Sequence, residues 1–106
     1  MVYIVDTVLV EPGQADEYVQ TVHAMGVPVM TAAGARFISC WTTAKDAGEP
    51  VSVQTVWAST DHGDWNEIRR NMVLDPAWYA FSNAISALWL GGSRRFYYPT
   101  DNSPTR

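Results

Sequence analysis

The sequence offers few side chains that could transfer protons, and two of them stand in unexpected places. Histidine occurs twice, at His23 and His62, and Asp6 interrupts the first apolar run, VYIVDTVLV. The period of two along a strand would place Asp6 on the same face as Ile4 and Val8. A carboxylate on an apolar face costs several kcal/mol unless it is paired, so we expect Asp6 to have a partner. An edge aspartate that reaches water is the alternative.

His23 lies beside the apolar stripe of an expected helix. Between Gln14 and Ala33, apolar residues recur every three or four positions, which is typical of one helical face. Pro28 removes a helical hydrogen bond, so we expect a kink near Ala24, just after the histidine. An imidazole at this corner could act as general base or acid. The alternative is that His23 is a partly exposed helical residue with no functional role.

We therefore predict a catalytic pair, in which Asp6 orients His23 or is itself the base. Aromatic side chains would form apolar walls, and Asn66, Tyr79 or Tyr97 could donate a hydrogen bond to a developing oxyanion. The predicted substrate-binding residues are Tyr18, Trp57, Trp65, Asn66, Trp78, Tyr79 and Tyr97. His62 is a weaker candidate, because its place in the turn TDHGD fits an exposed residue at a helix start.

The elements that must position these side chains follow from the hydrophobic patterns. Helical stripes begin near Gln14, Asp64 and Asp75, the last followed by a proline that fits a first helical position. Segments rich in β-branched and aromatic residues predict four strands: 2–10, 35–43, 51–59 and 93–99. The order strand, helix, strand, strand, helix, strand predicts an α+β, ferredoxin-like βαββαβ fold. We expect one domain over 1–99 and a frayed tail over 100–106.

Composition excludes several classes of function. Seven basic and eleven acidic side chains give a net charge of −4, which argues against binding nucleic acid. The single cysteine, Cys40, excludes a disulfide framework and a paired-cysteine metal site. No apolar run approaches the roughly 20 residues of a membrane span, and the first residues lack a basic leader. We therefore expect a soluble, cytoplasmic protein that binds neither nucleic acid nor membrane.

A four-stranded antiparallel sheet in this order would carry its helices on one face, leaving the other face bare. The strands bring valine, isoleucine, phenylalanine and tryptophan side chains to that face. A bare apolar sheet face predicts a partner, most simply a second copy that packs sheet to sheet. We therefore expect a homodimer.

Three short motifs indicate a family. The turn EPG precedes the first helix, VWAS closes the third strand and DPAWYAF opens the last helix. Together they resemble the NIPSNAP family within the dimeric α+β barrel superfamily, over residues 2–99. The resemblance implies a homodimer whose small-molecule sites lie between each sheet and its helices. The superfamily includes cofactor-free monooxygenases of polyketide quinols, polyketide cyclases, muconolactone isomerases and haem enzymes.

The residues and the resemblance together predict a small cofactor-independent enzyme. It would transfer protons on an apolar cyclic or aromatic substrate, polyketide- or terpenoid-like, as a cyclase, isomerase or quinol monooxygenase. The family's first strand often carries an arginine about where Asp6 stands, so we interpret Asp6 as a sign of proton transfer with a neutral or cationic ligand. The alternatives are haem held by His23 and a non-catalytic homodimeric binding or assembly module.

Overall fold

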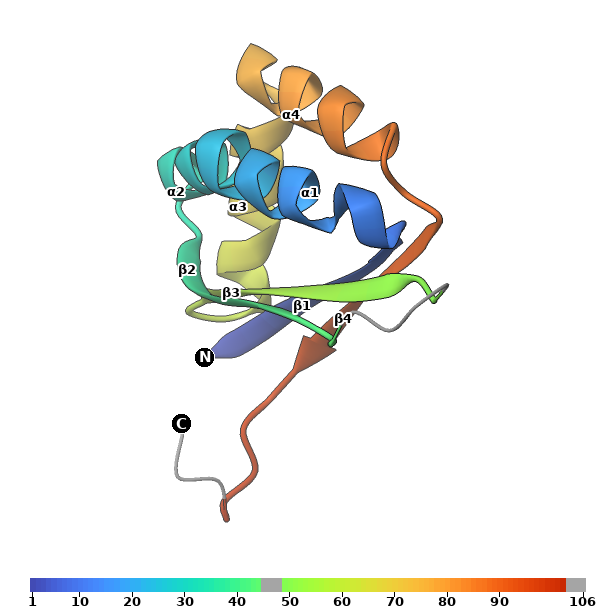
Figure 1. The fold of residues 1–106 in the computed structure, drawn as a ribbon. Helices are drawn as coiled ribbons and strands as arrows, with labels where there is room; N and C mark the ends of the chain where they lie inside the picture. The colour runs from blue at the N-terminus through green and yellow to red at the C-terminus, as the bar shows by residue number, and fades with distance from the viewer. Residues whose placement is uncertain (45–48, 103–106) are drawn as a thin grey trace.

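The computed structural model describes residues 1–44 and 49–102 and has one antiparallel sheet with the helices on one side (Figure 1). The strands are β1 (Val2–Val10), β2 (Arg36–Thr42), β3 (Val51–Ser59) and β4 (Gly91–Tyr97). Their order across the sheet is β2-β3-β1-β4, so each central strand belongs to a different half of the chain. The predicted ferredoxin-like α+β fold is confirmed.

The helical layer consists of two successive parts of the chain. The first contains a 3-10 turn, two short helices and a π-helical turn, and the second contains two longer helices. Their bounds are η1 (Pro12–Gln14), α1 (Ala15–Thr21), η2 (Val22–Gly26), α2 (Val27–Ala33), α3 (His62–Val73) and α4 (Pro76–Ser86). None of these helices is long and apolar enough to cross a membrane in the described part of the chain.

The predicted kink near Ala24 takes the form of the π-helical turn η2. The Val27 N–H bonds to the Val22 carbonyl five residues earlier. This wider turn lies just before Pro28, whose ring nitrogen cannot donate a helical hydrogen bond. Gly34, with φ of 114°, ends the helix in the left-handed conformation that glycine adopts without strain.

Aspartates begin both later helices. The Asp61 carboxylate accepts from the Asp64 N–H at 2.7 Å, while the Asp64 carboxylate accepts from the Thr60 N–H at 2.9 Å. This reciprocal arrangement starts α3 at His62. Asp75 caps α4, as its position before Pro76 predicts.

Side chains alternate between the two faces of the sheet. The register places Asp6 opposite Thr55 on β3 and opposite Arg94 on β4, so all three face the helices. The core on this face is apolar, and its largest fully buried side chains are Ile4, Met30, Ile68, Val2, Val10, Val22, Val51 and Val53. The polar group of Asp6 therefore stands inside an apolar layer.

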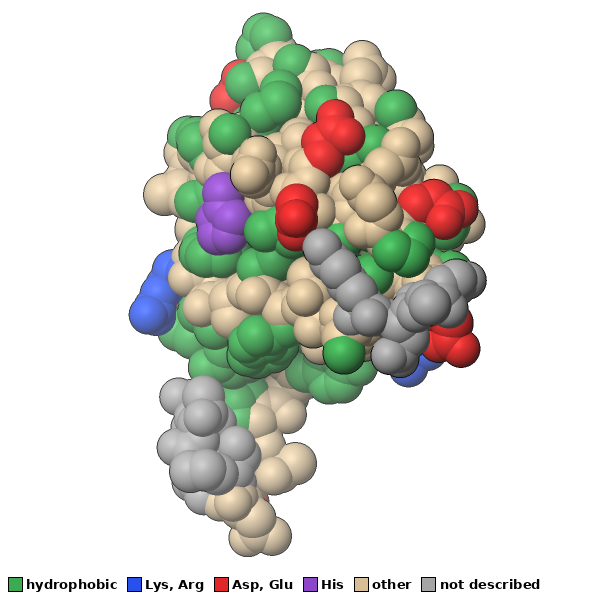
Figure 2. All heavy atoms as spheres, viewed as in Figure 1, with side chains coloured by type: hydrophobic (Ala, Val, Ile, Leu, Met, Phe, Trp, Pro, Cys, Tyr) green, Lys and Arg blue, Asp and Glu red, His purple; other side chains and the backbone are tan. Residues whose placement is uncertain are grey.

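The other face of the sheet carries exposed apolar side chains. Leu9, Trp41 and Tyr97 point to this side and are 41, 59 and 49% exposed. In Figure 2, hydrophobic side chains gather along the lower part of the molecule, at the level of the sheet in Figure 1.

β2 and β3 are antiparallel neighbours, as predicted. Of the expected loop between them, residues 45–48 lie outside the described residues, as do 103–106 of the expected tail.

Candidate functional site

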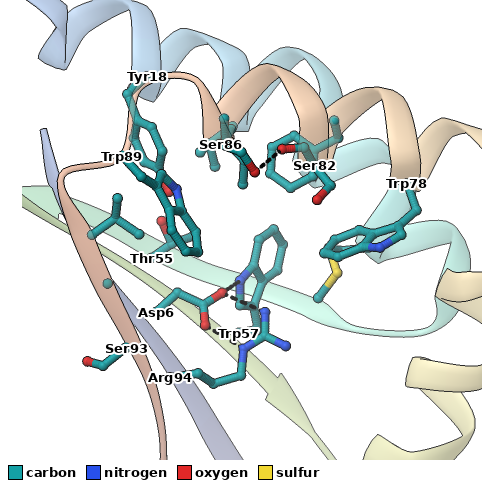
Figure 3. A pocket seen from close by; sticks show the side chains of 16 residues that line it. Asp6, Tyr18, Thr55, Trp57, Trp78, Ser82, Ser86, Trp89, Ser93 and Arg94 are labelled. Atoms are coloured by element: carbon teal, nitrogen blue, oxygen red, sulfur yellow. Dashed lines mark hydrogen bonds and ion pairs between the residues drawn. The ribbon is translucent and has the colours of Figure 1, made fainter.

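A cavity of about 390 Å³ lies between the sheet and the helices. Its volume is within the range of small-molecule sites. Most of its lining is apolar: Val8, Tyr18, Val22, Met30, Trp57, Trp78, Phe81, Ile85 and Trp89. The polar lining residues are Asp6, Thr55, Ser82, Ser86, Ser93 and Arg94. Figure 3 shows the aromatic side chains arranged around the carboxylate of Asp6.

Asp6 and Arg94 form the polar floor of the cavity. The Arg94 Nε donates to Asp6 Oδ1 at 2.5 Å, and its Nη2 donates to Oδ2 at 2.9 Å. Trp57 Nε1 donates to the same Oδ2 at 3.3 Å (Figure 3). The guanidinium also lies over the ring of Trp65, 5.2 Å from its centroid. Two opposite charges held in a bidentate pair give a neutral floor.

Tyr18 supplies a neutral hydroxyl beside this floor. Burial raises the pKa of Tyr18 to about 12, the polar group of Trp89 lowers it in part, and the charge of Asp6 adds to the rise. The hydroxyl therefore keeps its proton throughout the physiological range. A protonated phenol can donate a hydrogen bond to a ligand oxygen.

The cavity opens between α4 and the edge strand β4. Its deep lining residues Val22, Met30 and Phe81 are buried. Its exposed lining residues are Ser86, Trp89, Gly92, Ser93 and Arg94, all near the end of α4 or on β4. We call the region around these five residues the mouth.

Four of the predicted site residues line the cavity: Asp6, Tyr18, Trp57 and Trp78. Trp65 is buried next to the floor, where it contacts Arg94 and the edge of the Phe96 ring. The expectation that Asp6 has a partner inside the protein is confirmed. The partner is an arginine rather than the predicted histidine.

The structure does not bring His23 to Asp6. His23 is exposed, and its ring packs edge to face on Phe37 at 5.4 Å between centroids. It follows Val22, which lines the cavity, and one helical step turns its side chain away by about 100°. The catalytic role of His23 stays a prediction that this geometry does not support. Haem held inside the cavity by His23 does not fit this placement either.

The three predicted oxyanion donors also lie elsewhere. Asn66 is exposed on α3 beside a separate surface groove, and Tyr79 donates to the Val73 carbonyl at 2.9 Å. Tyr97 is an odd number of residues from Arg94, so it points to the other face of the sheet. None of the three lines the cavity, so their binding role stays a prediction that this geometry does not support.

Two important residues were missing from the sequence prediction. Arg94 neutralises Asp6, so the site is not reversed in charge as the interpretation of Asp6 implied. Trp89 lines the mouth and lowers in part the pKa of Tyr18. The run SRRFYYP contains the arginine, but its register against β1 decides whether Arg94 or Arg95 faces inward.

No group of three or more metal-binding side chains occurs among residues 1–44 and 49–102. The cavity's polar atoms are instead a carboxylate, a guanidinium and hydroxyls. This set suits hydrogen bonding to an organic ligand.

Comparison with known proteins places this chain in a family. The NIPSNAP family model matches residues 7–104, nearly the whole chain. The chain belongs to the NIPSNAP family. A NIPSNAP domain protein from Burkholderia xenovorans is 27% identical, with a TM-score of 0.83 over 98% of this chain and 99% of the other. A NIPSNAP protein from Agrobacterium tumefaciens is 26% identical, with a TM-score of 0.82 over 99 and 90%.

More distantly related structures share the fold of this NIPSNAP protein. A variant of SnoaB, a cofactor-independent oxygenase from Streptomyces nogalater, is 16% identical, with a TM-score of 0.60 over 97% of this chain and 96% of the other. At that identity the likeness concerns the fold. No curated protein matches the chain.

Proposed function

We propose that this NIPSNAP protein is a small cofactor-independent enzyme that transfers a proton on an apolar cyclic or aromatic substrate. The observation that carries the proposal is the paired Asp6 and Arg94 in a cavity walled by Trp57, Trp78 and Trp89. Flat indole surfaces favour flat, apolar ring systems. The charged pair offers an acceptor and donors at one place.

The floor suits a neutral ligand that bears a hydroxyl or an acidic C–H group next to a carbonyl. Asp6 would accept the proton, and the guanidinium of Arg94 would stabilise the oxyanion that forms. The protonated hydroxyl of Tyr18 would donate to the same oxygen. A ligand that is already anionic would find no uncompensated positive charge on this floor, because Asp6 neutralises Arg94.

Oxygenation is the reaction to test first. SnoaB, which shares this fold, is a cofactor-independent oxygenase. In such a reaction the deprotonated substrate itself reduces dioxygen. Anthrone is a suitable probe, because loss of its acidic C–H proton gives an electron-rich anion. Anthrone and dioxygen then yield anthraquinone and water, which balances atoms and electrons. Cyclisation and isomerisation would begin with the same proton transfer.

The test measures oxygen uptake with anthrone and identifies the product by mass spectrometry. We expect anthraquinone formation above the spontaneous rate, and a loss of at least about 100-fold in Asp6→Asn, which keeps the shape but cannot accept the proton. His23→Asn is the matched control and should retain wild-type turnover. Equal rates in wild type and Asp6→Asn would contradict the proposal.

A non-catalytic binding module is the second candidate. Asp6 already accepts three hydrogen bonds, from Arg94 twice and from Trp57 once, so it can serve purely as a fixed polar contact. The same experiment separates the two candidates. Saturable binding of anthrone without turnover in the wild type would favour the binding module.

We also propose that two copies pair through their open sheet faces. The exposed Leu9, Trp41 and Tyr97 on this side form the apolar surface that a second copy would cover. Light scattering should give about twice the chain mass at micromolar concentration, and Trp41→Glu should weaken the dimer. A stable wild-type monomer would overturn this part of the proposal.

A further inference from the structure

We infer that Trp65 is a positioning residue for Arg94: its indole ring fixes the plane of the guanidinium that pairs with Asp6. The sequence predicted Trp65 as a substrate-binding residue, but Trp65 does not line the cavity. It contacts Arg94, which does. The effect of Trp65 on ligand binding rests on the proposed function, whereas its hold on Arg94 does not.

The start of α3 holds Trp65 in place. The Trp65 N–H donates to the Asp61 carbonyl at 3.0 Å, within the turn that the reciprocal bonds of Asp61 and Asp64 close. The Trp65 side chain is only 2% exposed and belongs to the hydrophobic core, where side chains keep one rotamer. The indole is therefore a fixed surface against which a more mobile side chain can rest.

Arg94 is a side chain that needs such a surface. It lies on the edge strand β4, and its side chain is 34% exposed. A long side chain near solvent loses conformational entropy when it is held in one geometry. The two bonds to Asp6 fix one edge of the guanidinium, and the Trp65 ring, whose centroid is 5.2 Å from Cζ, covers one face. These two contacts together define the plane of the group.

The same contacts leave one nitrogen of Arg94 for a ligand. Nε donates to Asp6 Oδ1 and Nη2 donates to Oδ2, while residues 1–44 and 49–102 provide no hydrogen-bond acceptor for Nη1. Because a guanidinium is planar, the plane that Asp6 and Trp65 fix also fixes the direction of the Nη1 N–H groups. The proposed oxyanion donor is then oriented before a ligand binds.

Further rings join Trp65 to the end of β4. Phe96 lies two residues after Arg94, so both face the helices, and the Phe96 ring meets Trp65 edge to face at 5.8 Å between centroids. Phe96 also contacts His62, which stacks on Tyr98 and is hydrogen-bonded to its hydroxyl. Trp65 thus contacts two successive inward side chains of β4, which ties the edge strand to α3.

The first test examines Arg94 in the ligand-free protein. NMR would follow the exchange of its Nε–H proton with solvent, which reports how firmly the pair with Asp6 is held. Trp65→Leu removes the aromatic face, whereas Trp65→Phe keeps one. Phe81→Leu, which replaces a similarly buried ring on α4, is the matched control for loss of a core aromatic.

We expect the Arg94 Nε–H to exchange about fivefold faster in Trp65→Leu than in the wild type, because the cation–π contact is lost. Trp65→Phe should stay within about twofold of the wild type, since a phenyl face also attracts a cation. Phe81→Leu should exchange at the wild-type rate. A merely structural role of Trp65 would instead make both leucine variants exchange faster by the same factor.

The second test measures binding of 1-naphthol and naphthalene by equilibrium dialysis. Trp65→Leu should bind 1-naphthol about fivefold more weakly relative to naphthalene, because the ligand oxygen loses an oriented donor. In an Arg94→Gln background, Trp65→Leu should change this ratio by less than about twofold, because Trp65 acts through Arg94.

Three results would overturn the inference and leave the proposed function intact. They are a wild-type exchange rate in Trp65→Leu, equal acceleration in Trp65→Leu and Phe81→Leu, and a change in the ligand ratio that is the same with and without Arg94. If the wild type binds neither probe, the proposed function falls, and proton exchange still decides whether Trp65 holds Arg94.

A second route applies if Trp65→Leu does not fold. Replacing tryptophan throughout the protein by 5-fluorotryptophan keeps the shape of the ring and weakens the negative charge on its face. The Arg94 Nε–H should then exchange about twofold faster in the wild type and at an unchanged rate in Trp65→Phe. An unchanged rate in the fluorinated wild type would overturn the inference.

Discussion

Asp6 and His23 both interrupt an apolar pattern, yet Asp6 points into the protein and His23 points to solvent. Asp6 lies between Ile4 and Val8, which are almost fully buried, and the strand directs all three side chains to one face. His23 is one step along a helix from Val22, and that step takes it out to solvent. A polar side chain on a buried strand face cannot reach solvent, so it needs a partner within the protein.

The two surroundings also differ in chemistry. Asp6 is held by Arg94 and Trp57 at the floor of a cavity, whereas His23 contacts the edge of Phe37. Only the first arrangement combines charge, hydrogen-bond donors and enclosing aromatic walls. An out-of-pattern residue therefore indicates a site when its neighbours force it inward.

The largest expected loss of stability is at Gly26, which faces inward on the same π-helical turn that carries His23. A Cβ atom on Gly26 would lie 2.6 Å from Cζ of Phe81, which lines the cavity. Gly26→Ala should therefore lower the free energy of unfolding by about 2 kcal/mol, because overpacking exceeds the helical preference for alanine. Urea denaturation would measure this. A variant as stable as the wild type would show that Phe81 has room to move.

The pH dependence of stability tests how deeply the cavity wall is buried. The pKa of Tyr18 is about 12 in the folded protein and about 10 when unfolded. Between these values the unfolded chain releases the proton first, so stability should fall as pH rises from about 10 toward 12, by about 2 kcal/mol. Tyr18→Phe should remove this part of the decline. Urea titrations of both proteins at pH 9 and pH 11 compare the slopes, and identical slopes would contradict the assignment.

The third prediction compares the floor with a surface ion pair. Asp6→Ala should lower the free energy of unfolding by about 1–2 kcal/mol, because it leaves Arg94 and the Trp57 N–H without their acceptor. Glu67→Ala breaks the exposed pair with Arg70 and should cost less than about 0.5 kcal/mol. Thermal unfolding measures both. Equal losses would mean that the floor is solvated like the surface.

The smallest effect is expected at His23. His23→Ala removes an exposed ring that packs edge to face with Phe37, so the free energy of unfolding should change by less than about 0.5 kcal/mol. Denaturant unfolding of His23→Ala and Gly26→Ala, measured in parallel, would compare the stability lost on the outer and inner sides of the same turn. A loss above about 1 kcal/mol would show that the imidazole packs more firmly than its exposure indicates.

The sequence was sufficient for the fold because strands and caps leave strong local signals. The predicted strands 2–10 and 51–59 coincide with β1 and β3, and the Asp75 cap begins α4 as expected. The last strand begins earlier than predicted, at Gly91, because a glycine pair suggested a loop. Local patterns thus determine which elements form.

The site was only partly predictable, because it depends on contacts between distant segments. Tyr18, Trp57 and Trp78 sit at core spacing, which correctly indicated the cavity walls. Arg94 and Arg95 are adjacent and point to opposite faces, so only the pairing of β4 with β1 selects the partner of Asp6. Such long-range register leaves no signal in a single sequence.

The most direct test of the central claim is a calorimetric titration of 1-naphthol into the wild type, Asp6→Asn and His23→Asn. If the floor of the cavity binds the ligand hydroxyl, Asp6→Asn should weaken binding at least about tenfold, because a charge-assisted hydrogen bond is lost. His23→Asn should bind like the wild type. Loss of binding in His23→Asn with unchanged binding in Asp6→Asn would contradict the account.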